Sequence, residues 1–156
     1  KARDYYAQLL QKDYGDRYGK DFSYLTTSET IDSIEYFLFP NAFFFPGLTL
    51  PMVYRFRPDP VDPDYCNFDL LFLRPKSEDE SYSRPPDPIN LEVDESYTLV
   101  DSVGSLGAIY DQDTSNLAAQ TRGFKSSLKR GQTLGNYQEV RIRHLQMKVN
   151  EYISNC

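Results

Sequence analysis

Two short segments of alternating apolar and polar residues, joined by a proline-rich connection, constrain the fold of this chain more than any other feature. Residues 52–57 place Met52, Tyr54 and Phe56 on one face, and residues 65–73 repeat the alternation, as is typical of half-buried β-strands. The connecting sequence RPDPVDPD has the composition of a turn. A connection this short predicts that the two strands pair in an antiparallel arrangement.

A third strand is predicted just before these two. Residues 36–45, YFLFPNAFFF, are aromatic and apolar, with Pro40 and Asn41 in the middle. A proline inside a strand usually marks an edge or a bulge, so we expect the strand to bend or to change partner there. Three consecutive strands with short connections predict an antiparallel meander.

Helical patterns flank the predicted sheet. Residues 4–13 have apolar side chains at helical spacing and precede Gly15 and Gly19, which we expect to interrupt the helix. A second helix is expected from Gln112 to about Ser126 and a third over residues 136–154. The third carries an apolar stripe, which we expect to lie on the sheet, formed by Ile142, Leu145, Val149 and Tyr152.

The sequence therefore predicts an α+β domain in which an antiparallel sheet is covered by a long C-terminal helix. With 156 residues the chain is long enough for one domain with a real core. Residues 75–98 are polar, acidic and rich in proline, which predicts a surface loop.

Charge and hydropathy exclude several classes of partner. A net charge of -6 disfavours nucleic acid and anionic membranes, since both attract clustered Lys and Arg. No apolar run approaches the roughly 20 residues that span a bilayer, and no signal peptide is recognisable. We therefore expect a cytoplasmic protein whose partner is a small molecule or another protein.

Self-sufficient catalytic patterns are absent from the sequence. It contains no GxSxG, GxGxxG, P-loop or HExxH motif. Cys66 and Cys156 fit no CxxC pattern and are interpreted as one core thiol and one terminal thiol. The single histidine, His144, is interpreted as a surface or helix-packing residue.

The sequence IYDQDTSNLAAQTRGFKSS, residues 109–127, is more suggestive. On a helix, Asp113, Asn116 and Gln120 fall along one face together with Leu117 and Phe124. This face presents one carboxylate and two amides. Asp113 then has two interpretations, a carboxylate that stabilises the helix N-terminus and a metal ligand, and the pattern alone favours the first.

The order of several motifs resembles the C-terminal catalytic region of ring-hydroxylating Rieske oxygenases, over roughly residues 36–153. The motifs are FPN (39–41), VYRFRP (53–58), DLLFLRP (69–75), a D-x-x-N segment opening at Asp113, QxRGFxS (120–126) and a closing helix. The resemblance implies a helix-grip fold and makes residues 1–156 the C-terminal part of an oxygenase catalytic domain.

The resemblance also implies a metal centre. In this family the aspartate of the D-x-x-N segment is the carboxylate of a two-histidine, one-carboxylate Fe(II) site, which makes Asp113 the ligand and Asn116 and Gln120 its neighbours. Asp111 is a rival, but the third residue after it is Thr114 rather than Asn. One histidine cannot complete this site or a Rieske [2Fe-2S] cluster, so we expect both histidine sets upstream of Lys1.

Further expectations follow from the same resemblance. The substrate pocket would be lined by Asn41, Phe43, Val103, Gly107 and Ile109. The complete enzyme would hydroxylate a small hydrophobic or aromatic substrate with O2, would receive electrons from NAD(P)H through a reductase or ferredoxin, and would assemble as a homo-oligomer, often a trimer. Two alternatives remain open: a non-catalytic hydrophobic-ligand-binding protein of the same fold, and a purely structural domain.

Overall fold

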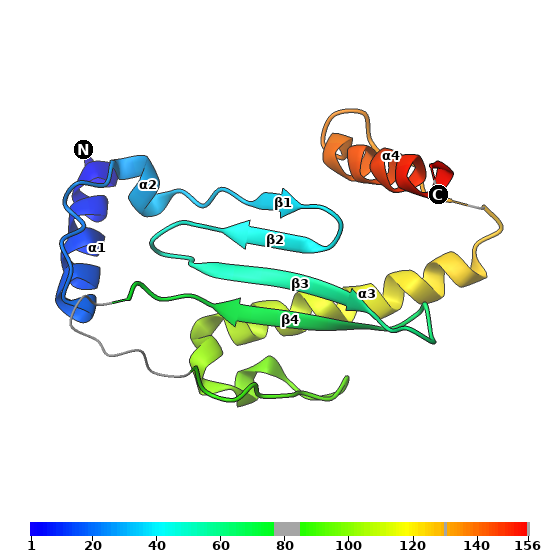
Figure 1. The fold of residues 1–156 in the computed structure, drawn as a ribbon, viewed down its shortest axis with the longest axis horizontal. Coiled ribbons are helices and arrows are strands. Elements are labelled where there is room, and N and C mark those ends of the chain that lie inside the picture. The colour runs from blue at the N-terminus through cyan, green and yellow to red at the C-terminus, as the bar shows by residue number, and fades with distance from the viewer. Residues whose placement is uncertain (77–84, 130, 156) are drawn as a thin grey trace. The chain divides into compact units, whose positions relative to one another are not determined.

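The chain forms a four-stranded antiparallel sheet and a set of helices, seen in a computed structural model that describes residues 1–76, 85–129 and 131–155 (Figure 1). The described residues fall into two compact units, one within Lys1–Ser83 together with Val149–Cys156 and the other within Arg84–Lys148. The first unit contains α1 (Ala2–Tyr18), α2 (Thr27–Ile31), β1 (Tyr36–Leu38), β2 (Ala42–Phe45), β3 (Met52–Pro58) and β4 (Cys66–Phe72). The second contains the 3-10 turns η1 (Tyr97–Leu99) and η2 (Asp101–Leu106) and the helix α3 (Gly107–Ser126), and α4 (Val140–Ser154) begins there and ends in the first.

The strands follow one another in the sheet in the order β1-β2-β3-β4, and every neighbouring pair is antiparallel. The predicted α+β class, the meander and the two alternating strands are thus confirmed. The predicted bent strand over residues 36–45 is wrong in detail, because these residues form two paired strands. The chain reverses direction at Pro40 and Asn41. The side-chain amide of Asn41 donates a hydrogen bond to the Phe56 carbonyl at 2.7 Å.

One face of the sheet is rich in aromatic side chains. Phe43 lies opposite Tyr54 and Phe56 lies opposite Phe68 in the strand register. The Phe43 ring centroid lies 4.9 Å from that of Phe37 and 6.1 Å from that of Phe56, which in turn stacks on Phe68 at 4.7 Å. These ring contacts link all four strands, so side-chain packing reinforces the backbone ladder.

On the opposite face, one carboxylate joins two strands. Asp69 of β4 accepts hydrogen bonds from Arg55 Nε at 2.8 Å and from Arg57 Nε and Nη2 at 2.7 and 2.9 Å. Both arginines stand on β3, and Arg55 is the register partner of Asp69. The guanidinium of Arg57, ahead of that of Arg55, holds the pKa of Asp69 below its ordinary value.

Helix α1 is longer than predicted, since it continues through Gly15 to Tyr18 and is capped by Gly19. Gly19 adopts φ 64°, a left-handed conformation typical of glycine at a helix C-terminus. Gln11 of α1 donates to the Leu25 carbonyl at 2.8 Å and to Thr30 Oγ1 at 2.9 Å. This side chain fastens α2, which begins with a capping box between Thr26 and Glu29, to α1.

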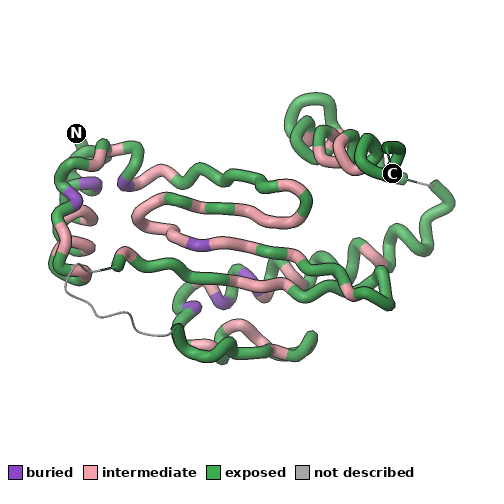
Figure 2. Tube along the Cα trace, in the orientation of Figure 1, coloured by how far each residue is buried: buried purple, intermediate pink, exposed green. Residues whose placement is uncertain are grey.

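Helix α4 differs from its prediction in length and burial. It begins at Val140 rather than near residue 136, and none of its described residues is buried (Figure 2). Of its apolar stripe, Tyr152 makes a ring contact with Phe39, at 4.8 Å between centroids. His144 is exposed on this helix, as predicted. Among the described residues, no helix is long and apolar enough to cross a membrane.

The predicted core thiol at Cys66 is wrong, because this side chain is exposed. Cys66 pairs with Pro58 at the last position of the β3–β4 ladder, where the sheet ends and little remains to cover it. Cys156 lies outside the described residues, as do residues 77–84 of the predicted 75–98 loop. The described remainder of that loop contains no helix or strand until η1 begins at Tyr97.

Candidate functional site

Helix α3 presents two faces of different character, and its first turns carry the candidate metal-binding residues. Gly107 and Tyr110 are buried and Asp111 and Thr114 are half-buried, at the spacing of one helical face. The helix starts at Gly107, five residues before the start predicted from the sequence. The face predicted to carry Asp113, Asn116 and Gln120 exists and is exposed.

Asp111 faces inward and is used by the fold. Its carboxylate accepts hydrogen bonds from Ser96 Oγ at 2.6 Å and from the backbone N–H of Tyr97 at 2.9 Å. The Tyr97 ring also contacts that of Tyr110, with 5.5 Å between centroids. Asp111 therefore anchors η1 to α3, and this carboxylate is occupied by the protein itself.

Asp113 faces away from η1. Its side chain is exposed, and within the described part of the chain its carboxylate makes no hydrogen bond or ion pair. Of the two rival aspartates, Asp113 is thus the one whose oxygens are available to an external group. The interpretation of Asp113 as a carboxylate that stabilises the helix N-terminus does not hold, because Asp113 lies more than one turn after the start of α3.

The two amides predicted beside Asp113 share its face. Asn116 Nδ2 donates to the Gln112 carbonyl one turn earlier, at 3.0 Å. That bond leaves the Asn116 carbonyl oxygen available as an acceptor. Gln120 is exposed one turn further along.

A complete metal centre is not formed by the described residues. Across residues 1–76, 85–129 and 131–155, no group of three or more His, Cys, Asp or Glu side chains is close enough to hold a metal ion. Asp113 fits one position of a carboxylate-containing iron site, since it offers two unengaged anionic oxygens. The remaining ligands are not provided by its surroundings in this unit.

The predicted pocket residues of the sheet have structural partners. Asn41 is half-buried and ties the β1–β2 reversal to β3 through its bond to the Phe56 carbonyl. Phe43 is half-buried within the aromatic face. Both residues belong to the first unit.

The other predicted pocket residues belong to the second unit, with Asp113. Val103 is buried in η2 and Ile109 is 51% exposed on α3. Gly107 is packed against η1, because a Cβ added there would meet the Thr98 nitrogen at 3.0 Å and its Cα at 3.1 Å. The structure therefore gives Gly107 a close-packing role, and it gathers the predicted pocket residues into two sets, one in each unit.

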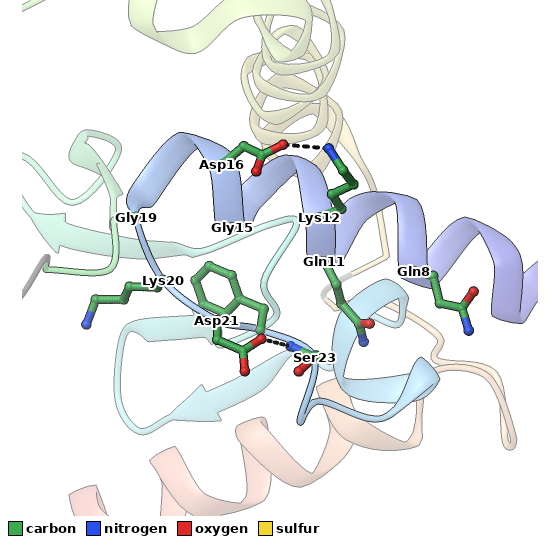
Figure 3. A pocket seen from close by; sticks show the side chains of 10 residues that line it. Gln8, Gln11, Lys12, Gly15, Asp16, Gly19, Lys20, Asp21 and Ser23 are labelled. Carbon is green, nitrogen blue, oxygen red and sulfur yellow. Dashed lines mark hydrogen bonds and ion pairs between the residues drawn. The ribbon is translucent and has the colours of Figure 1, made fainter.

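A pocket lies where no site was predicted, between α1 and the loop that follows it (Figure 3). Its polar groups bond to one another: Lys12 Nζ donates to Asp16 at 2.8 Å, and the backbone N–H of Ser23 donates to the Asp21 carboxylate at 2.8 Å. The hydrogen bonds from Ser23 lower the pKa of Asp21 below its ordinary value. The lining shows no convergent set of groups with catalytic chemistry.

The anchor between Ser96 and Asp111 was missed from the sequence. Its members are 15 residues apart, and no local pattern links them. The local signal that exists is the Ser96-x-Thr98 pair, in which the Ser96 hydroxyl accepts from the Thr98 N–H at 3.1 Å, as such residues do in turns.

Comparison with known protein families gives a match over residues 11–155 to the family described as ring hydroxylating alpha subunit (catalytic domain). This match confirms the resemblance drawn from the FPN, VYRFRP and D-x-x-N motifs. Comparison with curated proteins and with solved structures gave no match.

Proposed function

The chain belongs to the ring-hydroxylating alpha subunit family, as part of its catalytic domain, and from this membership we propose that Asp113 is the carboxylate ligand of a non-heme iron centre. Membership makes the chain part of an oxygenase. The observation that supports the assignment is the contrast between two nearby aspartates. Asp111 is bound by Ser96 and Tyr97, whereas the carboxylate of Asp113 is exposed and unengaged within the described residues.

The ligand count of the chain gives the proposal a second part. A two-histidine, one-carboxylate site needs two histidines, and these 156 residues contain one, His144. We therefore assign the histidine ligands, and the Rieske [2Fe-2S] domain that would deliver electrons, to polypeptide outside these residues. On this proposal residues 1–156 are the C-terminal part of the catalytic domain.

The protein's own contribution to the reaction would be to bind and orient the substrate. Iron, when bound, supplies the activation of O2. Phe43 and its neighbouring rings offer an apolar, aromatic surface suited to a small hydrophobic or aromatic molecule. From the family resemblance alone, we propose that the substrate pocket is lined by Asn41, Phe43, Val103, Gly107 and Ile109.

The remaining components follow from the family rather than from the geometry. We propose that electrons come from NAD(P)H through a reductase or ferredoxin, and that the complete subunit is a cytoplasmic homo-oligomer. No feature of the described residues favours the alternative of a non-catalytic binding protein.

The assignment of Asp113 is tested by the iron content of the complete subunit. We expect Asp113→Ala to lose stoichiometric iron after dialysis, because a facial site that lacks its carboxylate retains only neutral ligands. Asp101→Ala is the matched control, since Asp101 is also an exposed aspartate of the same unit. If the Asp113 variant holds as much iron as the wild type, the assignment is wrong.

The histidine assignment is tested with the 156 residues alone. We expect this chain to hold no stoichiometric Fe(II) after dialysis, because it supplies one carboxylate where three protein ligands are needed. Tight, stoichiometric Fe(II) in the isolated chain would contradict the assignment of the histidines to other polypeptide.

A further inference from the structure

The contacts between η1 and the start of α3 form a small, well-defined assembly, here called the η1 anchor, made by Ser96, Tyr97, Thr98, Gly107 and Asp111. The Asp111 carboxylate accepts two hydrogen bonds, from Ser96 Oγ and from the Tyr97 N–H. Ser96 Oγ also lies 2.6 Å from Thr98 Oγ1 and accepts from the Thr98 N–H. Two polar groups of this turn are therefore bonded to a single carboxylate on α3, and Thr98 is linked to it through Ser96.

Gly107 allows the turn and the helix to approach. Its α-hydrogen faces the Thr98 backbone at a point where a Cβ would lie 3.0 Å from the Thr98 nitrogen. A distance this short is tighter than nine in ten contacts made by real Cβ atoms. The anchor thus combines directional hydrogen bonds from Asp111 with a steric fit at Gly107, one helical turn before it.

This combination fixes the rotation of α3 about its own axis. An α-helix advances by about 100° per residue, so Asp111 and Asp113 point about 200° apart. When the Asp111 carboxylate is held against η1, Asp113 must face the opposite, exposed side. Asn116 follows Asp113 by three residues and faces the same side.

We propose that Asp111 is a positioning residue for the iron centre: by accepting from Ser96 and Tyr97 it sets the rotation of α3 and thereby the direction of the Asp113 carboxylate. This inference rests on the proposed function, because it presupposes that Asp113 binds iron. In this proposal Asp111 itself binds no metal. Its partners are supplied by the protein, and its effect on iron passes through the helix.

The test compares Fe(II) affinity and apoprotein melting temperature in the complete subunit carrying Asp111→Ala, Asp111→Asn or Ser96→Ala. We expect Asp111→Ala to weaken Fe(II) binding by about ten- to a hundredfold, the usual cost of removing a group that orients a ligand. Asp111→Asn keeps an oxygen acceptor for the Tyr97 N–H and is expected to recover most of the affinity. Ser96→Ala removes one of the two bonds without changing α3 and is expected to fall between the wild type and Asp111→Ala.

A spectroscopic readout separates orientation from stability. The visible absorption of Co(II) bound in place of iron reports ligand geometry, and we expect it to change in Asp111→Ala and to be restored in Asp111→Asn. Asp101→Ala, which changes an exposed carboxylate outside the anchor, is expected to alter neither the spectrum nor the affinity.

Each contrary outcome has a distinct meaning. If Asp113→Ala abolishes iron binding while Asp111→Ala leaves affinity and spectrum unchanged, the positioning role is wrong and the proposed function stands. If affinity across the series follows the melting temperature and not the presence of an acceptor at residue 111, Asp111 is only structural and the inference is overturned. If Asp113→Ala leaves iron binding intact, the proposed function fails and the inference fails with it.

Discussion

Phe56 and Phe68 stack across strands β3 and β4, with ring centroids 4.7 Å apart and ring planes inclined by 7°. The two residues are direct register partners. Phe43 meets Phe56 edge-on at 6.1 Å, and Tyr54 meets Phe68 edge-on at 5.3 Å. The stacked pair therefore stands at the centre of the aromatic face, where contacts from β2, β3 and β4 converge.

A double-mutant cycle on this pair should give a measurable coupling. Leu in place of either ring keeps apolar bulk but removes the aromatic contact, so Phe56→Leu, Phe68→Leu and the double variant isolate the pair. We expect a coupling free energy of about 1 kcal/mol, as measured for other aromatic pairs. Urea unfolding provides the free energies, and additive effects of the two substitutions would show that the stacking contributes nothing.

Asp69 should make the stability of the sheet depend on acid pH. Its pKa is lowered by the hydrogen bonds from Arg57 and Arg55, so the folded carboxyl loses its proton more readily than the unfolded one. The resulting stabilisation is complete above the unfolded pKa, about 3.9, and is lost as the pH falls through the lower folded pKa. We expect Asp69→Asn to cost about 1 kcal/mol near neutral pH, since both arginines are half-exposed.

The measurement is the free energy of unfolding of wild type and Asp69→Asn as the pH is lowered from neutrality. The difference between the two proteins should shrink below the unfolded pKa of the carboxyl, because the wild type then loses the charge that the variant lacks. Asp16→Asn serves as a control, since the Asp16–Lys12 pair is largely exposed. If the difference in free energy of unfolding between wild type and Asp69→Asn stays constant with pH, the Asp69 charge does not stabilise the sheet.

The contribution of Thr30 to the stability of the protein should come from its hydroxyl group more than from its branched shape. It is fully buried, donates to the Thr26 carbonyl at 2.9 Å and accepts from Gln11 Nε2 at 2.9 Å. Thr30→Val keeps the branched shape and removes both bonds, which we expect to cost about 1–3 kcal/mol because the Gln11 amide loses a partner. Thr30→Ser keeps the hydroxyl and is the comparison; if it is less stable than Thr30→Val in urea unfolding, packing outweighs the hydrogen bonds.

The sequence predicted those parts of the structure whose signals are local. Strands β3 and β4 were found because apolar alternation and the proline-rich connection lie within the same short stretch. The β1–β2 hairpin was read as one bent strand, since Pro40 and Asn41 fit a bend as well as a reversal. The pairing of Leu38 with Ala42 and of Tyr36 with Phe44 shows the reversal, and the aromatic composition of both halves carries no signal of that pairing. Gly15 was read as a helix end, although a helix tolerates glycine and the left-handed conformation falls at Gly19.

In the candidate site too, the local features could be predicted from the sequence and the contacts between distant residues could not. The common face of Asp113, Asn116 and Gln120 follows from helical periodicity alone and is present in α3. The inward role of Asp111 depends on Ser96, and the early start of α3 depends on the fit of Gly107 against Thr98. These contacts arise only when η1 folds back on the helix, and no periodic pattern could disclose them.

Two glycines of α3 should respond in opposite directions to the same substitution. At Gly123 a Cβ would meet nothing within 4 Å, so Gly123→Ala gains helix propensity without a clash and should stabilise the protein by up to about 1 kcal/mol. At Gly107 the same methyl group would press on the Thr98 backbone at 3.0 Å, and backbone cannot rotate away as a flexible side chain can. We expect Gly107→Ala to destabilise by about 1–3 kcal/mol, the usual cost of overpacking. Thermal unfolding of the two variants gives the comparison, and because the pair shares one helix and one chemical change, equal shifts in melting temperature would mean that the close approach of η1 to α3 does not exist in solution.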